Sequence, residues 1–228
     1  MREIVFDTET TGLDPLTGDR MVEMGCVELV NRIPTGNTFH AYYNPERDMP
    51  MEAERVHGLS ASFLSDKPLF AANVGALLDF LGDAPLVAHN AQFDFGFLNH
   101  ELKTCGYAEI SLDRMIDTLA IARRRHPGAK HTLDALCSRY GVDRSHRVLH
   151  GALLDAELLA QVYVELTGGR QIGLGLAVDN TPGDVRQQTR FMPRVGEYRA
   201  PRPHAASSEE LARHEKFLES VNAPLWTN

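Results

Sequence analysis

Apolar positions along this chain predict strands first and alternating strands and helices afterwards. A β-branched and aromatic run at residues 4–6 is typical of a strand, and turn-forming residues follow it. Two longer runs alternate apolar and polar positions, and a brief apolar run is typical of a strand buried between helices. We expect the first three strands to form an antiparallel meander with Gly36-Asn37 near a hairpin turn. The predicted strands span residues 4–6, 20–30, 37–43, 86–88 and 112–116.

Apolar side chains three and four residues apart predict helices between and after the later strands. Several of these helices stop at a glycine, and Asn90 is a good N-cap for the helix after the fourth strand. The predicted helices span residues 52–56, 71–81, 91–105, a segment ending in the arginines 123–125, 131–140 and 151–166. Strands that alternate with helices indicate the α/β class, with a mixed sheet and helices on both faces.

The amino-acid composition of the chain changes after Gly169. Residues 179–208 are rich in Pro, Gly, Arg, Gln and Ser, which predicts a flexible linker. Ser207 and Glu210 have the spacing of a capping box, so a short helix is expected to begin there. The predicted organisation is a folded domain over residues 1–170, a linker over 171–206 and a C-terminal segment over 207–228.

Charge and cysteine content narrow the possible functions. The three cysteines are widely spaced and form no Cys-x-x-Cys pair, which argues against disulfides or structural zinc and for a reducing cytoplasm. No apolar run reaches the ~18 residues of a membrane span, and no secretory leader pattern is present. The net charge of −8 comes entirely from residues 1–170. An acidic body attracts polyanions poorly, so a nucleic-acid substrate would require metal ions and a tethering partner.

Candidate chemistry begins at the first strand, with Asp7 and Glu9 at positions i and i+2. Side chains alternate along a strand, so these two carboxylates point to the same face. At ~4 Å and an effective dielectric constant of ~20, their repulsion is roughly 4 kcal/mol, and a cation between them would remove it. The alternative is a solvated strand end with two chance acids.

Two later segments carry further candidates. Asp94 lies in the first turn of a predicted helix, where an acid also complements the helix dipole. His150 stands just ahead of the last helix of the domain, and Asp155 lies one turn into it. A partly buried loop histidine is the alternative reading of His150.

Together these segments resemble the DEDD-type 3′→5′ exonucleases, in the subgroup whose third motif carries a histidine. The resemblance rests on Asp-x-Glu-Thr-Thr-Gly at 7–12, on Asn-x-x-Phe-Asp at 90–94 and on His-x-x-x-x-Asp at 150–155, in that order. Within this group, the chain is similar to the proofreading (epsilon) subunits of bacterial DNA polymerase III over residues 1–170. That closer similarity is carried by residues 56–58, 89–94, 131–134 and 150–156.

The resemblance implies a ribonuclease-H-like exonuclease fold, with a five-stranded mixed sheet flanked by helices and a flexible C-terminal tail ending in a short helix. It implies two divalent ions, Mg²⁺ or Mn²⁺, held by the carboxylates of Asp7, Glu9, Asp94 and Asp155, and oxygen ligands suit these ions. His150 would be the general base. Thr8, Thr10 and Phe93 are expected to shape and pack the site.

The implied reaction is hydrolysis of the 3′-terminal phosphodiester of DNA, with release of deoxynucleoside monophosphates. Glu9 and Asp155 would also contact the substrate. Glu52 and His57 would contact the terminal nucleotide, although a solvated acid and a helix-end cap are their alternative readings.

The tail suggests two partners. Residues 171–176 look like a glutamine-led peptide that docks on the sliding clamp, with Gln171, Leu174 and Leu176 as the contacts. The alternative is a chance apolar start to the linker. The C-terminal segment is expected to bind the catalytic subunit of a replicative polymerase. The expected contacts there are Leu211, Phe217, Leu218 and Trp226.

Three functions compete. The first is the proofreading exonuclease of a replicative DNA polymerase. The second is a stand-alone 3′→5′ exoribonuclease or oligonucleotide trimmer, which has no need of a linker and anchor. The third is a catalytically dead scaffold that only stabilises the polymerase. The presence of all five chemical residues argues against this scaffold.

Overall fold

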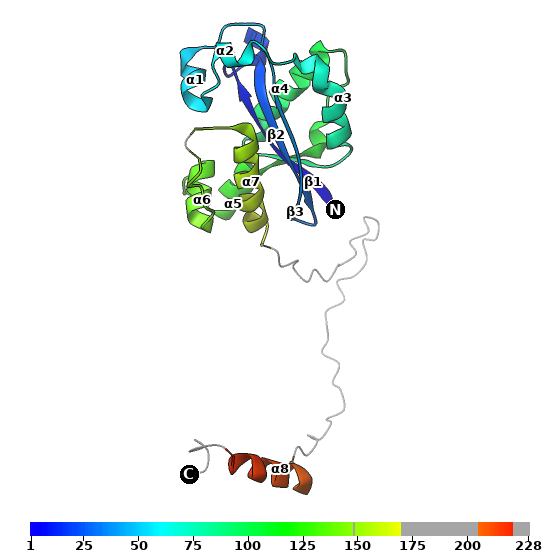
Figure 1. Cartoon of the computed structure of the whole chain (residues 1–228), viewed down its shortest axis with the longest axis vertical. Coiled ribbons are helices and arrows are strands. Elements are labelled where there is room, and N and C mark those ends of the chain that lie inside the picture. The colour runs from blue at the N-terminus through cyan, green and yellow to red at the C-terminus, as the bar shows by residue number, and fades with distance from the viewer. Residues whose placement is uncertain (148, 170–204, 221–228) are drawn as a thin grey trace, which may run out of the picture. The chain divides into compact units, whose positions relative to one another are not determined.

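The computed structural model describes residues 1–147, 149–169 and 205–220 (Figure 1). The chain divides into two units, Met1–Leu176 and Ala177–Asn228, and each is described by itself. Within the described residues, no helix has both the length and the apolar character needed to span a membrane.

A five-stranded sheet forms the centre of the first unit, in the order β3-β2-β1-β4-β5. β1 pairs antiparallel with β2 and parallel with β4, so the sheet is mixed, as predicted, and β1 is its central strand. The strands are β1 (Arg2–Thr10), β2 (Met21–Val30), β3 (Ile33–Tyr42), β4 (Leu86–Ala88) and β5 (Met115–Asp117).

Three local predictions about the strands need correction. β1 extends to Thr10, so Asp7 and Glu9 lie within the paired strand and not at its end. The hairpin turns at Asn31 and Arg32, with φ of 51° and 64°, and not at Gly36-Asn37. Pairing of Val30 with Ile33 favours this tight two-residue turn, for which positive φ at both residues is typical. The predicted strand 112–116 begins instead as a 3₁₀ turn, Leu112–Arg114, which the Ser111 side chain caps.

Helices cover both faces of the sheet, and a short 3₁₀ turn, η1 (Pro15–Thr17), follows β1. The helices of this unit are α1 (Met51–His57), α2 (Ala61–Leu64), α3 (Phe70–Leu81), α4 (Ala91–Thr104), α5 (Thr118–Arg125), α6 (Leu133–Tyr140) and α7 (Ala152–Leu166). The one-turn helix α2 was not predicted. Asn90 is the N-cap residue of α4, but its side chain makes no capping bond, because φ is 65° there. Asp117 Oδ1 accepts the Asn90 backbone N–H instead, at 3.0 Å.

The two faces of β1 build two different cores. Ile4 and Phe6 pack with α3 and α4, whereas Val5 packs with α7. Figure 1 shows α7 on the face opposite α3 and α4. Strand alternation then places Asp7 and Glu9 on the α7 face and Thr8 on the α4 face. The hydrophobic pattern of β1 therefore decides which helix each polar side chain meets.

In the second unit, α8 spans Ser208–Leu218 and begins at the predicted capping box of Ser207 and Glu210. Leu211 and Phe217 are exposed on this helix. The predicted clamp peptide 171–176, most of the predicted linker and Trp226 lie outside the described residues.

Candidate active site

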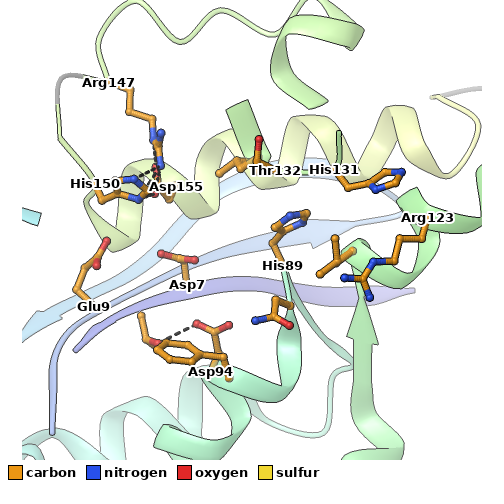
Figure 2. Close-up of a pocket in the computed structure, with 15 residues that line it drawn as sticks. Asp7, Glu9, His89, Asp94, Arg123, His131, Thr132, Arg147, His150 and Asp155 are labelled. Carbon is orange, nitrogen blue, oxygen red and sulfur yellow. Dashed lines mark hydrogen bonds and ion pairs between the residues drawn. The ribbon is translucent and has the colours of Figure 1, made fainter. Parts of the chain in front are cut away.

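One cavity of about 620 Å³ is lined by all five residues predicted to be catalytic (Figure 2). It lies where the second half of β1 meets the beginnings of α4 and α7. These residues are separated by up to 148 positions in the sequence, and they are Asp7, Glu9, Asp94, His150 and Asp155.

Asp94 enters the cavity from the first turn of α4 and is buried. The hydroxyl of Thr8, on the same face of β1 as α4, donates a hydrogen bond of 2.8 Å to Asp94 Oδ1. Thr8 was predicted only to shape and pack the site, but it also orients a carboxylate. Asp94 therefore reaches the cavity from the side of the sheet opposite α7.

Asp155 and His150 lie next to each other on the α7 side. Asp155 is buried in the first turn of α7, and His150 precedes that helix with a half-exposed ring. Their nearest side-chain atoms, His150 Nδ1 and Asp155 Oδ2, are 3.1 Å apart. The backbone N–H of His150 donates to Val56 O at 3.1 Å, which fastens the histidine to α1.

The electrostatics of three of the carboxylates reflect crowding of negative charge. Burial first, and then Asp94 and Glu9, raise the pKa of Asp7 well above its usual range. Burial together with Asp155 and Glu23 raises the pKa of Glu9 to about 8. Burial raises the pKa of Asp94 to about 7, against the hydrogen bond from Thr8. A bound cation would favour the charged forms of these three acids.

The donor set fits a hard divalent cation. Glu9, His150 and Asp155 each offer a ligand atom, and these three atoms all lie within 4.8 Å of one another. Asp7 and Asp94 line the same cavity and add further carboxylate oxygens. Oxygen-rich sets of this kind suit Mg²⁺ and Mn²⁺.

A second cavity of about 500 Å³ adjoins the first and contains the two residues expected to contact a terminal nucleotide, Glu52 and His57. Thr8, Glu9 and Phe93 line both cavities. The His57 ring is buried, its Nδ1 accepts the Leu59 N–H at 3.0 Å, and its Nε2 has no hydrogen-bond partner among the described residues. Asp155, also expected to contact substrate, lines only the first cavity.

Two residues near the site were not predicted from the sequence. Glu23 pairs with Glu9 across β1 and β2, is buried, and accepts a hydrogen bond from His40 Nε2 at 2.7 Å if that nitrogen is protonated. The correct hairpin register would have revealed it. Arg147 binds Asp155 through its guanidinium, and no spacing pattern in the sequence indicates this contact.

The basic residues 123–125 form the last turn of α5, and two of them have different surroundings. Arg123 lines the first cavity, at the end marked by His89 and His131 (Figure 2). Arg125 Nη1 instead donates to Leu166 O at 2.7 Å, which ties α5 to α7.

Comparison with known proteins identifies relatives along nearly the whole chain. Residues 4–163 match the exonuclease (RNase T) family. The DNA polymerase III subunit epsilon of Rickettsia felis is 51% identical over 97% of this chain and 97% of its own length. The subunit of the same name from Escherichia coli K12 is 42% identical, over 96% of this chain and 93% of its own length.

Solved structures support the fold. The nuclease domain of 3′hExo, a DEDDh family member bound to rAMP, superposes with a TM-score of 0.63 at 18% identity, over 73% of this chain and 91% of that one. Exonuclease X in complex with 5′ overhanging duplex DNA gives 0.55 at 24% identity, over 72% and 90%. These similarities confirm the predicted ribonuclease-H-like exonuclease fold. The chain belongs to the exonuclease family and, within it, to the DNA polymerase III epsilon subunits.

Proposed function

We propose that this chain is the proofreading 3′→5′ exonuclease of a replicative DNA polymerase and that it hydrolyses the 3′-terminal phosphodiester of a mispaired strand. The observation that carries the proposal is the convergence of four carboxylates and one imidazole on a single cavity, in a member of the epsilon-subunit family. The products would be deoxynucleoside monophosphates.

The four acids Asp7, Glu9, Asp94 and Asp155 line one cavity and would hold two divalent ions. Together with a phosphodiester these acids would place about five negative charges in one cavity, and two divalent ions would cancel four of them. Bound ions of this kind lower the pKa of an attacking water and stabilise the leaving 3′ oxygen. The protein's own contribution is to hold the carboxylates in place, and Thr8 does this for Asp94.

His150 would take the proton from the attacking water. It stands at the rim of the cavity, ahead of α7, with a half-exposed ring that a substrate can reach. A histidine in this position can also pass the proton on to solvent.

The second cavity would receive the terminal nucleotide. Its walls include the apolar side chains of Leu13, Val56 and Phe93, and nucleobases stack on surfaces of this kind. The Nε2 of His57 and the carboxylate of Glu52 would contact the sugar and base. Glu9, shared by both cavities, would contact the 3′-hydroxyl.

Recruitment would depend on the tail, because the acidic domain attracts DNA poorly. The relatives are named as subunits of DNA polymerase III, and the exposed Leu211 and Phe217 of α8 suit docking on a polymerase subunit. A weak clamp contact through Gln171, Leu174 and Leu176 would gain strength from the high effective concentration within such an assembly.

A 5′-labelled primer with a 3′ mismatch, incubated with Mn²⁺ or Mg²⁺, tests the proposal. Wild type should shorten the primer one nucleotide at a time, and Asp7→Asn should not. Asp79→Asn, on the exposed side of α3, is the matched control and should act like wild type. Equal rates of hydrolysis by Asp7→Asn and wild type would show that Asp7 is not a catalytic residue. Faster trimming of RNA ends than of mispaired DNA ends would favour the exoribonuclease instead.

A further inference from the structure

The guanidinium of Arg147 lies beside Asp155 and His150, on the α7 side of the site. Nε and Nη2 donate to the two oxygens of Asp155, and the Nη2–Oδ2 distance is 2.7 Å. Nη1 donates to Asp134 Oδ1 at 2.9 Å, and Nη2 lies 2.7 Å from His150 Nδ1. One side chain therefore connects the first turn of α6, the first turn of α7 and the imidazole of His150. Figure 2 shows Arg147 beside His150 and Asp155.

This contact is built into the fold and is not a surface pairing. The side chains of Arg147 and Asp155 are 9% and 4% exposed. Paired donors in a rigid fork match both oxygens of a carboxylate, and this geometry is stronger than a single ion pair. Burial raises the pKa of Asp155, but hydrogen bonds from Arg147 and His150 outweigh it, so the pKa lies below the usual range. Asp155 thus differs from Asp7, Glu9 and Asp94.

A divalent ion held by Glu9, His150 and Asp155 would need an oxygen of Asp155, and Arg147 already donates to both oxygens. A guanidinium and a divalent cation on one buried carboxylate repel each other strongly, because both carry positive charge at short range. Arg147 can withdraw without breaking a helix, since it lies in the loop between α6 and α7.

We propose that Arg147 and the divalent ion compete for Asp155, so that Arg147 holds Asp155 and His150 in position before the ion binds and releases both when it does. This inference rests on the proposed function, because it assumes that Asp155 is an ion ligand. Arg147 is then a positioning residue that also sets how readily the ion enters.

The competing explanation is a purely structural clamp, and the two make opposite predictions. If Arg147 only supported Asp155 and His150, its removal would weaken ion binding. If it competes with the ion, its removal strengthens ion binding.

Mn²⁺ affinity of the full-length protein, measured without DNA by titration calorimetry or by the EPR signal of free Mn²⁺, decides between them. Arg147→Gln should bind Mn²⁺ at least ~5-fold more tightly than wild type, within the usual range of coupling between two ligands. Arg144→Gln is the matched control, because Arg144 pairs with the same Asp134 at 3.0 Å and has no contact with Asp155 among the described residues. It should bind Mn²⁺ like wild type.

Unchanged or weaker binding by a folded Arg147→Gln variant would overturn the inference. If that variant does not fold, the Arg147 Nε–H signal of the wild-type protein provides the test by NMR. Saturating Mg²⁺ should speed its exchange with solvent, and unchanged protection would overturn the inference equally. Loss of Mn²⁺ binding in Asp7→Asn would support the metal centre, whichever result Arg147→Gln gives. Failure of wild type to bind Mn²⁺ would instead count against the proposed function.

Discussion

Gly25 on β2 lies directly beneath the backbone of Leu153 at the start of α7. A Cβ atom built on Gly25 would lie 2.2 Å from the Leu153 nitrogen, closer than any real contact allows. Gly25 is also the cross-strand partner of Asp7. The missing side chain therefore lets α7 approach the sheet beside Asp7 and bring Asp155 into the cavity, as glycines in strands do where another backbone comes close.

Gly25→Ala should push α7 away from the sheet and separate Asp155 from Asp7. We expect a loss of about 1–3 kcal/mol in the free energy of unfolding, from overpacking, together with a large loss of exonuclease activity. Urea unfolding and primer hydrolysis measure the two effects. Gly75→Ala, in the interior of α3 with open space around it, should instead stabilise the fold by about 0.5–1 kcal/mol. Wild-type stability and activity in Gly25→Ala would contradict this account of α7.

Without divalent ions, the free energy of unfolding should fall as pH rises from about 4.5 to about 8. The pKa of Glu9 is raised from 4.5 to about 8, so in this range the folded protein keeps a proton that the unfolded chain has lost. Asp94, with its pKa raised to about 7, acts in the same direction. Saturating Mg²⁺ should abolish the fall, because ions replace the protons.

Urea unfolding at several pH values, with EDTA or with Mg²⁺, measures this dependence. Glu9→Gln should be more stable than wild type in EDTA at pH 8, by on the order of 1–3 kcal/mol, and should be inactive. A wild-type stability in EDTA that rises over this pH range would show that the carboxylates are not crowded as described.

Thr8→Val removes the hydroxyl that orients Asp94 while keeping the branched shape that suits a strand. We expect activity and Mn²⁺ affinity to fall about 10–100-fold, as for other residues that support metal ligands. Thr8→Ser keeps the donor and should retain most of both. Equal behaviour of the valine and serine variants would mean that Thr8 only packs.

His150→Gln separates two roles for the imidazole. Because His150 acts as the general base, loss of its imidazole should lower kcat by about 10²–10⁴-fold and leave Mn²⁺ affinity close to that of wild type. A ring nitrogen of His150 also lies within 4.8 Å of carboxylate oxygens of Glu9 and Asp155, a spacing at which all three could hold one ion. A large drop in Mn²⁺ affinity would make His150 an ion ligand, contrary to the proposed role.

Deletion of residues 207–228 tests the tail. The truncated protein should hydrolyse free oligonucleotides at the wild-type rate, because the site lies wholly within the first unit, and should no longer co-purify with the polymerase subunit. Leu211→Glu, on an exposed position of α8, is a milder change with the same expected loss of docking. Loss of hydrolysis upon deletion would mean that the tail supports the fold.

Strand alternation is a local rule, and it correctly predicts that Asp7 and Glu9 share a face. The resemblance to the DEDD-type exonucleases, and no local rule, implied that Asp94, His150 and Asp155 join them. Arg147 could not be predicted, because its contacts depend on how the loop before α7 folds back onto Asp134 and Asp155. The clash that makes Gly25 necessary was hidden for the same reason, since it involves a helix 128 residues further along the chain.

The hairpin shows where a strong local signal loses to pairing between strands. Gly36-Asn37 is a good turn sequence, yet β2 and β3 continue past it and pair as far as Val30 and Ile33. Asn31 and Arg32 accept left-handed conformations as a result.

The most direct test of the two-ion site is a crystal of the wild-type protein soaked in Mn²⁺ and examined by anomalous scattering. We expect two peaks ~3.5–4 Å apart in the first cavity, both in contact with Asp7 and flanked by Asp94 and Asp155. Peaks that avoid Asp7, or a cavity without anomalous signal at saturating Mn²⁺, would contradict the two-ion site.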